Sequence, residues 1–350
     1  MPETTKIALD AMGGDIGPGA AIPAAAAVLK DNPSVEFLFF GDEKEIAMAL
    51  SNFPALQKSS QIIHTDKKIS SDEKPSNAIR LGKGSSMYLA IEAVRDGKAD
   101  AIVSGGNTGA LMALAKLILK SMPGVHRPAL ASIFPGTQGN SIMLDLGANV
   151  LVDAETLTQF AIMGAVFAGV QKKITTPTLG LLNVGTEDTK GPDHVKAAAA
   201  ILKRLSFPGQ YVGYVEGNDI TVGKVDVIVC DGYAGNIALK AVEGTGKMLG
   251  EFLSRTLRAD PLAILGGALS YFAFKRLKKQ LDPRQYNGGV FLGLNGICVK
   301  SHGSSDEVGF ATAIKLALNM AQQGYIQSTA DQIAHLLTQE NIVAEEMYRD

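Results

Sequence analysis

Residues 6–18, KIALDAMGGDIGP, join an apolar strand-like run to a helical pattern through a glycine turn. The run Ile7, Ala8 and Leu9 is typical of a short buried strand, and the Ala-rich residues 20–29 predict a helix. A strand that feeds a helix through glycines leaves backbone N–H groups directed into a crevice, with the positive end of the helix dipole behind them. The stretch therefore predicts an anion site in an α/β fold. The alternative is a tight turn that uses glycine only for its backbone freedom.

The same alternation of strand and helix continues along the chain. Ala- and Leu-rich helical patterns separate strand-like runs at residues 35–40, 101–103, 141–146, 178–184 and 225–229. This pattern predicts a three-layer, Rossmann-like α/β sandwich with a mostly parallel central sheet. Ligands of open α/β sheets bind at the carboxyl ends of strands, and four of these runs end in glycine, Asp or Asn. Because no linker, repeat or low-complexity tract divides the sequence, a single α/β domain is expected.

The composition excludes several classes of protein. Of the 350 residues, 46% are apolar and 19% are charged, which suits a soluble globular protein with a large core. The 33 basic and 35 acidic residues give a formal net charge of -2, whereas a nucleic-acid-binding protein would carry a basic excess. Cys230 and Cys298 lie in apolar runs without disulfide or zinc spacing, so no metal and no cofactor are expected.

Neither secretion nor a membrane-spanning segment is predicted. The first residues, MPETTKIALD, lack the charged start and long apolar core of a secretory signal, so a cytoplasmic location is expected. The longest uncharged apolar stretch, residues 261–274, is shorter than the roughly 20 residues that a transmembrane helix needs.

Further turns carry groups that suit an anion. Residues 104–109, SGGNTG, follow a strand, and Ser104, Asn107 and Thr108 can donate hydrogen bonds while the glycines let the backbone approach a ligand. The alternative is an N-cap by Asn107 or Thr108. Residues 72–86 place several cations and hydroxyls around a helix start, which ordinary solvated helix charge explains equally well.

Three later segments supply candidate side chains. Lys190, in NVGTEDTKG, is a candidate anion ligand unless this is only a charged surface loop. Asn236, in CDGYAGN, can cap a helix or bind a ligand. His302 lies in KSHGSSD, where neighbouring Ser, Lys and Asp residues favour a functional role over a structural one. Because the motifs of nucleotide kinases, zinc hydrolases and serine esterases are absent, these turns suggest a reaction in which phosphate is itself a reactant.

Several longer segments together carry a family resemblance. They are DAMGGD (10–15), DEKPSNAIR (72–80), KGSSM (83–87), SGGNTGALMA (104–113), RPALA (127–131), LDLGAN (144–149), GTEDTKG (185–191), YVEGNDI (214–220), DVIVCDGYAGNIALK (226–240) and SHGSSD (301–306). On these the chain resembles the phosphate acyltransferase family, the acyl-[acyl-carrier-protein]:phosphate acyltransferases of bacterial phospholipid synthesis. Two departures are Gly105, where the family more often has Ala, and NGGVF at 287–291, which would reshape the wall of the acyl site.

The resemblance implies a fold similar to that of the isocitrate and isopropylmalate dehydrogenases. It also implies transfer of a fatty acyl group from acyl carrier protein to inorganic phosphate, by a homodimer. The acyl phosphate would then serve a membrane glycerol-3-phosphate acyltransferase in the synthesis of phosphatidic acid.

Positioning and charge are sufficient for this reaction. Phosphate is largely dianionic near neutral pH and a thiol of pKa about 8.5 is a fair leaving group, so no covalent enzyme intermediate is required. We expect Lys190 to help hold the phosphate, Asn236 or Lys300 to polarise the thioester carbonyl, and His302 to protonate the departing thiolate. The expected phosphate-binding residues are Asp10, Gly13, Gly14, Gly105, Gly106, Asn107, Thr108 and Ser304.

Two other functions remain open at this point. A metal-dependent hydroxy-acid dehydrogenase of similar fold would need clustered aspartates, for which Asp226 and Asp231 are the only suggestive pair. A non-catalytic module that binds acyl carrier protein or phosphate would use the same turns without turnover.

The most apolar and basic stretch is residues 251–282. Pro261 and the Gly-Gly pair at 266–267 predict two short amphipathic helices joined by a bend. One alternative is a hairpin packed in the core or the dimer interface. The other is peripheral contact with a bilayer, and the same basic residues would also suit an acidic acyl carrier protein. The helical run at 238–257 is expected to supply part of the dimer contact.

Overall fold

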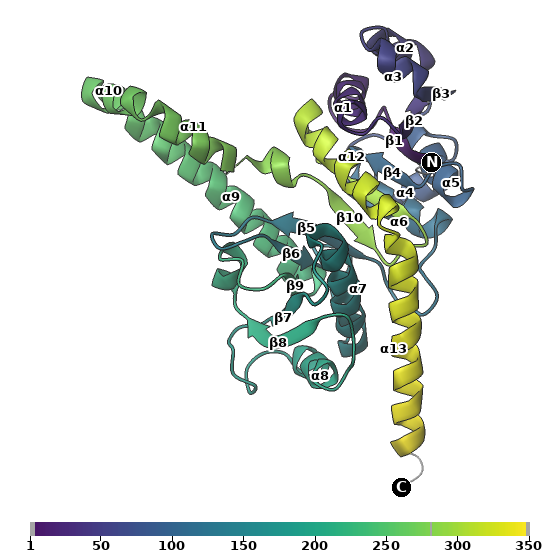
Figure 1. Cartoon of the computed structure of the whole chain (residues 1–350), viewed down its shortest axis with the longest axis vertical. Helices are drawn as coiled ribbons and strands as arrows, with labels where there is room; N and C mark the ends of the chain where they lie inside the picture. Colours follow the sequence, from purple (N-terminus) through teal and green to yellow (C-terminus); the bar gives the residue numbers. More distant parts are fainter. Residues whose placement is uncertain (1–3, 281, 348–350) are drawn as a thin grey trace.

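A single sheet of 11 strands, covered by helices on both faces, organises the molecule (Figure 1). The structure is a computed structural model that describes residues 4–280 and 282–347. The strands are β1 (Thr5–Asp10), β2 (Val35–Gly41), β3 (Ser60–His64), β4 (Ala101–Ser104), β5 (Ala129–Phe134), β6 (Ser141–Leu144), β7 (Thr178–Leu182), β8 (Gln210–Val215), β9 (Val227–Val229), β10 (Gly289–Leu292) and β11 (Ile297–Lys300). Their order across the sheet is β3-β2-β1-β4-β11-β10-β5-β6-β9-β7-β8.

Seven of the ten neighbouring strand pairs are parallel. The three antiparallel pairs join β11 to β10, β10 to β5 and β5 to β6. The mostly parallel sheet predicted from the sequence is therefore confirmed. Because three reversals lie between β11 and β6, the strands from β6 to β8 run opposite to those from β3 to β11, and their carboxyl ends lie at the opposite end of the sheet.

The helices form the two outer layers. They are α1 (Pro18–Asp31), α2 (Glu43–Leu50), α3 (Pro54–Lys58), α4 (Pro75–Leu81), α5 (Ser86–Arg95), α6 (Thr108–Ile118), α7 (Ala154–Lys172), α8 (Asp193–Leu202), α9 (Gly232–Leu257), α10 (Pro261–Leu269), α11 (Tyr271–Gln280), α12 (Glu307–Gln322) and α13 (Tyr325–Met347), with 3-10 helices η1 (Gly217–Thr221) and η2 (Pro283–Tyr286).

Alternate residues of each strand enter different cores. In β1, Ile7 and Leu9 belong to the core that also contains residues of α1 and α12, whereas Ala8 belongs to the core with α5 and α6 on the other face. Farther along the sheet, α9 covers Met143 and Ile228 on the face opposite α7. This period of two is the property of a strand covered on both sides, and it confirms the predicted three layers.

Most of the helices and strands predicted from local sequence patterns are present. The predicted helix at 20–29 lies within α1, and the predicted strands at 35–40 and 101–103 correspond to β2 and β4. In α1 the Pro at the first position is compatible with helix because its missing N–H would have no helical partner there.

The stretch 251–282 has a break before Pro261 as predicted, but it forms three helical segments rather than two, with the Gly-Gly pair at 266–267 inside α10. It contains the end of the 26-residue helix α9, then α10 and α11, and Figure 1 shows these helices as an arm that leaves the body of the molecule. A break follows α9 because Asp260 accepts a hydrogen bond from the Ala263 N–H at 2.9 Å and Pro261 begins α10. None of the residues of α10 is buried, so the arm is not packed in the core of its own chain. No helix among the described residues is long and apolar enough to cross a membrane.

Candidate functional site

Three parallel strands end side by side at one end of the sheet. Asp10, the last residue of β1, is in register with Ser104 of β4, and Ser104 is in register with Lys300 of β11. Each strand is followed by one of the glycine-containing turns predicted to bind an anion. The structure therefore brings together three turns that are far apart in sequence: Asp10 and Ser104 are separated by 94 positions, and Gly105 and Lys300 by 195.

The three turns are in direct backbone contact. The Asp15 N–H donates to the Gly303 carbonyl at 2.8 Å, and the Ser301 N–H donates to the Ser104 carbonyl at 2.9 Å. Gly14 has a φ of 86°, and a Cβ there would lie 2.8 Å from the Gly303 oxygen. Only glycine allows this approach without strain.

Asp10 organises the turn after β4. Its Oδ2 accepts a hydrogen bond from the Ser104 hydroxyl at 2.6 Å, and the Ser104 oxygen accepts from the Gly106 N–H at 3.0 Å. A Cβ on Gly13 would lie 2.6 Å from the same Oδ2, so a side chain there would disturb this chain of bonds. Burial raises the pKa of Asp10, while hydrogen bonding by Ser104 acts against that rise. Asp10 is thus placed to orient donors rather than to touch an anion itself.

Lys300 connects two of the turns. Its Nζ donates to the Gly105 carbonyl at 3.2 Å and to the Ser301 carbonyl. Burial lowers the pKa of Lys300 to about 8, and the charges of Asp10 and Asp15 act against that fall. A partly desolvated cation beside converging backbone groups is suited to an anionic ligand, because its charge is weakly screened there.

His302 and Ser304 lie on the exposed side of the same cluster. The Ser304 hydroxyl lies 2.9 Å from His302 Nδ1, and the Ser304 N–H donates to that nitrogen at 3.3 Å. Since Nδ1 accepts, the proton of the neutral ring is on Nε2. The sequence reasoning missed Asn287, which accepts from the His302 N–H at 3.0 Å and donates to the Ser301 hydroxyl at 2.8 Å. Its only signal was its position before a strand in a segment that departs from the family pattern.

Asn107 and Thr108 have different surroundings. Asn107 Oδ1 accepts from the Ala110 N–H at 2.8 Å, and its Nδ2 donates to the carbonyls of Ser71 and Glu73 at 2.7 and 3.2 Å. The side chain of Asn107 therefore caps α6, as the alternative interpretation had it, although its backbone N–H stays a candidate ligand. Thr108 is exposed at the first position of α6.

Lys190 and Asn236 are not part of this cluster within one chain. Lys190 follows β7 and is paired with Glu187 at 2.9 Å, and Asn236 lies in the first turns of α9, close to Gly147. β7 is five positions from β11 in the sheet, about 24 Å at the usual strand spacing, and it ends at the opposite end. The turns therefore form two separate sets: the first set follows β1, β4 and β11, and the second set follows β6, β7 and β9.

The second set surrounds a buried carboxylate. Asp145 accepts hydrogen bonds from the backbone N–H groups of Leu130, Ala148 and Asn149 and from the Asn149 side chain, at 2.6 to 3.0 Å. Burial raises the pKa of Asp145, and these bonds act against the rise. The peptide bond between Leu144 and Asp145 is cis.

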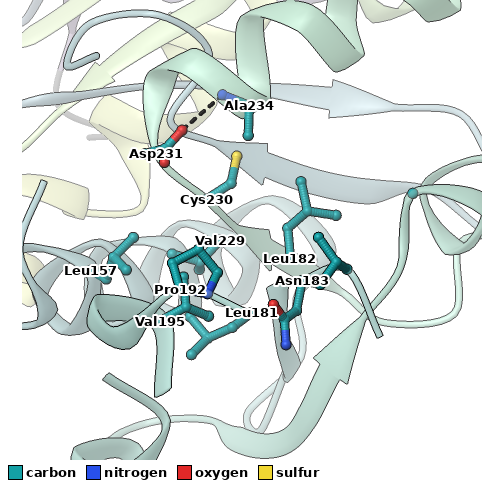
Figure 2. Close-up of a pocket in the computed structure, with 12 residues that line it drawn as sticks. Leu157, Leu181, Leu182, Asn183, Pro192, Val195, Val229, Cys230, Asp231 and Ala234 are labelled. Carbon is teal, nitrogen blue, oxygen red and sulfur yellow. Dashed lines mark hydrogen bonds between the residues drawn. The ribbon is translucent and has the colours of Figure 1, made fainter. Parts of the chain in front are cut away.

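A pocket of about 280 Å³ opens at the ends of β7 and β9 (Figure 2). Its lining is mostly aliphatic, with Asp231 at the start of α9 above it. The lining residues are Leu157, Leu181, Leu182, Asn183, Val184, Pro192, Val195, Gly217, Val229, Cys230, Asp231 and Ala234. The Cys230 thiol is buried, and burial raises its pKa, so it is not an active nucleophile.

The aspartate pair considered for a dehydrogenase has structural partners. Asp226 forms an ion pair with Lys172 at 2.6 Å and accepts from the Thr178 N–H at 2.9 Å. Asp231 caps α9 by accepting from the Ala234 N–H at 2.7 Å.

Comparison with known proteins decides the family. The sequence model of the family described as "Fatty acid synthesis protein" matches residues 5–328. The chain belongs to this family. A protein named phosphate acyltransferase from Rhodospirillum centenum is 50% identical over 336 residues, which are 96% of this chain and 95% of that protein. One of the same name from Parvibaculum lavamentivorans is 51% identical over 322 residues, 92% of this chain and 89% of that protein. The resemblance stated from the sequence is therefore confirmed.

Solved structures agree on the fold. EutD phosphotransacetylase from Staphylococcus aureus has a TM-score of 0.58 at 17% identity, covering 92% of this chain and 94% of its own. A phosphotransacetylase from Streptococcus pyogenes has a TM-score of 0.57 at 20% identity, with the same coverage of both chains.

Replacing Gly14 should weaken phosphate binding selectively. Gly14→Ala forces a Cβ against the Gly303 carbonyl and separates two of the turns, so we expect at least about a tenfold loss of affinity for inorganic phosphate in calorimetry. Gly97→Ala is the matched control, because Gly97 also has a positive φ, of 67°, but nothing within 4 Å of an added Cβ. Gly97→Ala should lose about 1 kcal/mol of unfolding free energy in urea, and Gly14→Ala should lose more because its Cβ also meets the Gly303 carbonyl. Equal phosphate affinity in the two variants would contradict the assignment of this site.

Proposed function

We propose that the chain transfers a fatty acyl group from the thioester of acyl carrier protein to inorganic phosphate. A phosphate oxygen attacks the thioester carbonyl carbon, the C–S bond breaks, and acyl phosphate and a free thiol result. The observation that carries the proposal is the cluster around Lys300, where three turns predicted to bind an anion meet in a chain whose relatives are named phosphate acyltransferase. The dehydrogenase and the purely binding module have no comparable support.

The phosphate is held by the turns of the first set. The backbone N–H groups of Gly14, Gly105, Asn107 and Thr108 supply donors. The Gly13 and Gly106 N–H groups, also predicted as ligands, instead donate to the Asp10 carbonyl and the Ser104 hydroxyl and so hold the turns in shape. Lys300 supplies the positive charge. Because an anion in this position is held at fixed geometry beside the carbonyl carbon, the reaction gains from orientation rather than from a strong base.

In this proposal the imidazolium form of His302 protonates the departing thiolate from Nε2 and becomes the neutral ring, while its Nδ1 side is held by the Ser304 hydroxyl. Lys300 also polarises the thioester carbonyl as negative charge develops on its oxygen. The roles predicted for Lys190 and Asn236 remain predictions, because both residues lie with the second set of turns. An unchanged KM for phosphate in Lys190→Ala would rule out its role as a phosphate ligand.

Release of free thiol tests the function. Palmitoyl-loaded acyl carrier protein is mixed with the protein, and thiol is followed with and without phosphate. The proposal predicts release that requires phosphate and yields acyl phosphate in equal amount. Release without phosphate would indicate a hydrolase, and absence of release with stable binding would indicate a binding module; either outcome contradicts the transferase.

The pKa of Lys300 predicts a pH dependence. Its cation is present below about pH 8 and is lost as pH rises, so the KM for phosphate should increase from about pH 8 to 9.5, approaching tenfold per pH unit. Phosphate is already a dianion in this pH range, so its own ionisation does not contribute to the change in KM. Lys300→Arg should remove the slope, whatever its absolute KM, because arginine stays protonated. A flat profile in the wild type, or the same slope in the variant, contradicts Lys300 as the ligand.

We also propose that the protein is a homodimer, with α9 as part of the contact. The residues of α9 beyond the body carry exposed apolar side chains, among them Met248, Leu249 and Phe252 at 45 to 58% exposure. Such a surface is suited to a second copy of the same helix. A sedimentation mass near 36.7 kDa at micromolar concentration would contradict the dimer.

Contact with a bilayer is proposed for α10 and α11. Leu262, Leu269 and Phe272 are 75 to 80% exposed, and Lys275 and Arg276 follow in α11. Large apolar side chains next to cations give reversible attachment to an anionic surface. A cytoplasmic enzyme attached in this way would release acyl phosphate where a membrane glycerol-3-phosphate acyltransferase uses it.

Charge placed on the arm should abolish membrane binding alone. The triple variant Leu265→Glu, Leu269→Glu and Phe272→Glu changes exposed positions, so the fold and acyl transfer in solution should be retained while sedimentation with anionic liposomes is lost. Met48→Glu, at a position 74% exposed on α2, is the control and should still sediment. Liposome binding by the triple variant would falsify the assignment.

A further inference from the structure

A basic surface segment lies beside the phosphate turns and has no role in the chemistry proposed above. Residues 66–83 contain five basic and three acidic side chains, an excess of two positive charges in a chain whose net charge is -2. The cations are Lys67, Lys68, Lys74, Arg80 and Lys83, all exposed, and within residues 4–280 and 282–347 none of them forms an ion pair.

Two of the acidic side chains accept hydrogen bonds from within the same segment. Asp72 accepts a hydrogen bond from the Ser70 hydroxyl, and Glu73 accepts from the Asn77 amide at 2.9 Å. These neutral donors leave both carboxylate charges in place, so the segment presents a net excess of two positive charges to a partner.

Apolar side chains accompany the cations. Ile79 and Leu81 on α4 are 46% and 65% exposed and lie on either side of Arg80 in sequence. A surface with exposed aliphatic side chains among unpaired cations is suited to an acidic protein partner rather than to a small anion, because both apolar and charged contacts are offered.

The segment is joined to the turns that are proposed to hold phosphate, directly through Asn107 and indirectly through Ser86. Asn107, in the turn after β4, donates to the carbonyls of Ser71 and Glu73 at 2.7 and 3.2 Å. At the start of the segment, the Lys67 carbonyl accepts from the Ser86 N–H at 2.9 Å. Burial raises the pKa of Asp10, and hydrogen bonding by the Ser86 hydroxyl acts against that rise, so Ser86 also contacts the Asp10 side chain. A partner seated on this segment would be held next to the site where Asp10, Ser104 and Lys300 meet.

We propose that residues 67–83, with Arg80 and Lys83 at their centre, are the docking surface for the acidic acyl carrier protein that delivers the thioester. The proposal rests on the acyl transfer proposed above. It assigns the carrier to a surface beside the phosphate turns, and not to the basic residues of the arm.

Charge reversal at the centre of the surface tests this. For Arg80→Glu with Lys83→Glu we expect the KM for palmitoyl-loaded carrier protein to rise about tenfold at low salt, with the KM for phosphate unchanged and kcat reduced less than twofold. Affinity for the unacylated carrier protein, measured by fluorescence anisotropy, should fall by the same factor. The difference from wild type should shrink at about 0.5 M salt, where the charges are screened.

Two control variants separate the outcomes. Lys44→Glu with Lys58→Glu reverses two exposed, unpaired lysines on α2 and α3 and should leave every constant unchanged. Arg255→Glu with Arg258→Glu reverses charge on the arm. The proposal is overturned if the Arg80 and Lys83 variant binds the carrier normally, if either control loses as much affinity, or if the KM for phosphate rises equally. Failure of the transferase proposal would be visible separately, as absence of phosphate-dependent thiol release in the wild type.

Discussion

The hydrogen bonds from Gly106 to Ser104 and from Ser104 to Asp10 are the constraint on which the site depends. They require β1 and β4 to be adjacent, parallel and in register, so that the last residue of each strand meets the other. A carboxylate as buried as Asp10 is stable only when it accepts such bonds, and once they form, the backbone donors after β4 are fixed in direction. The turns that are proposed to hold phosphate are therefore kept in position by strand pairing before any ligand binds.

The addition of β11 beside β4 completes the arrangement. It brings Lys300 next to Gly105 and carries the turn with Gly303 against Gly14. Burial between these turns lowers the pKa of the lysine to about 8, which leaves a cation with little solvent around it at neutral pH. Backbone donors, a desolvated cation and glycines that allow close approach are together what an anionic nucleophile needs in order to be held and oriented.

Local patterns were sufficient to predict the elements but not their grouping. The strand, glycine turn and helix around residues 6–18 depend on near neighbours, so they could be predicted from the sequence. Lys190 and Lys300 are both expected at a strand end, but local sequence patterns do not reveal the antiparallel insertion of β10 and β5 that places them at opposite ends of the sheet. The cap formed by Asn107 and the break at Asp260 follow local rules that were visible, and the role of Asn287 depends on contacts with distant turns.

Phosphate is proposed to bind where β1, β4 and β11 end. A crystal structure of the protein with inorganic phosphate would show directly whether it does. We expect phosphate in contact with the backbone N–H groups after Gly13 and Ser104, with Lys300 Nζ within hydrogen-bond distance of a phosphate oxygen. Phosphate found only beside Lys190 and Asn236, with the turns around Lys300 empty, would contradict it.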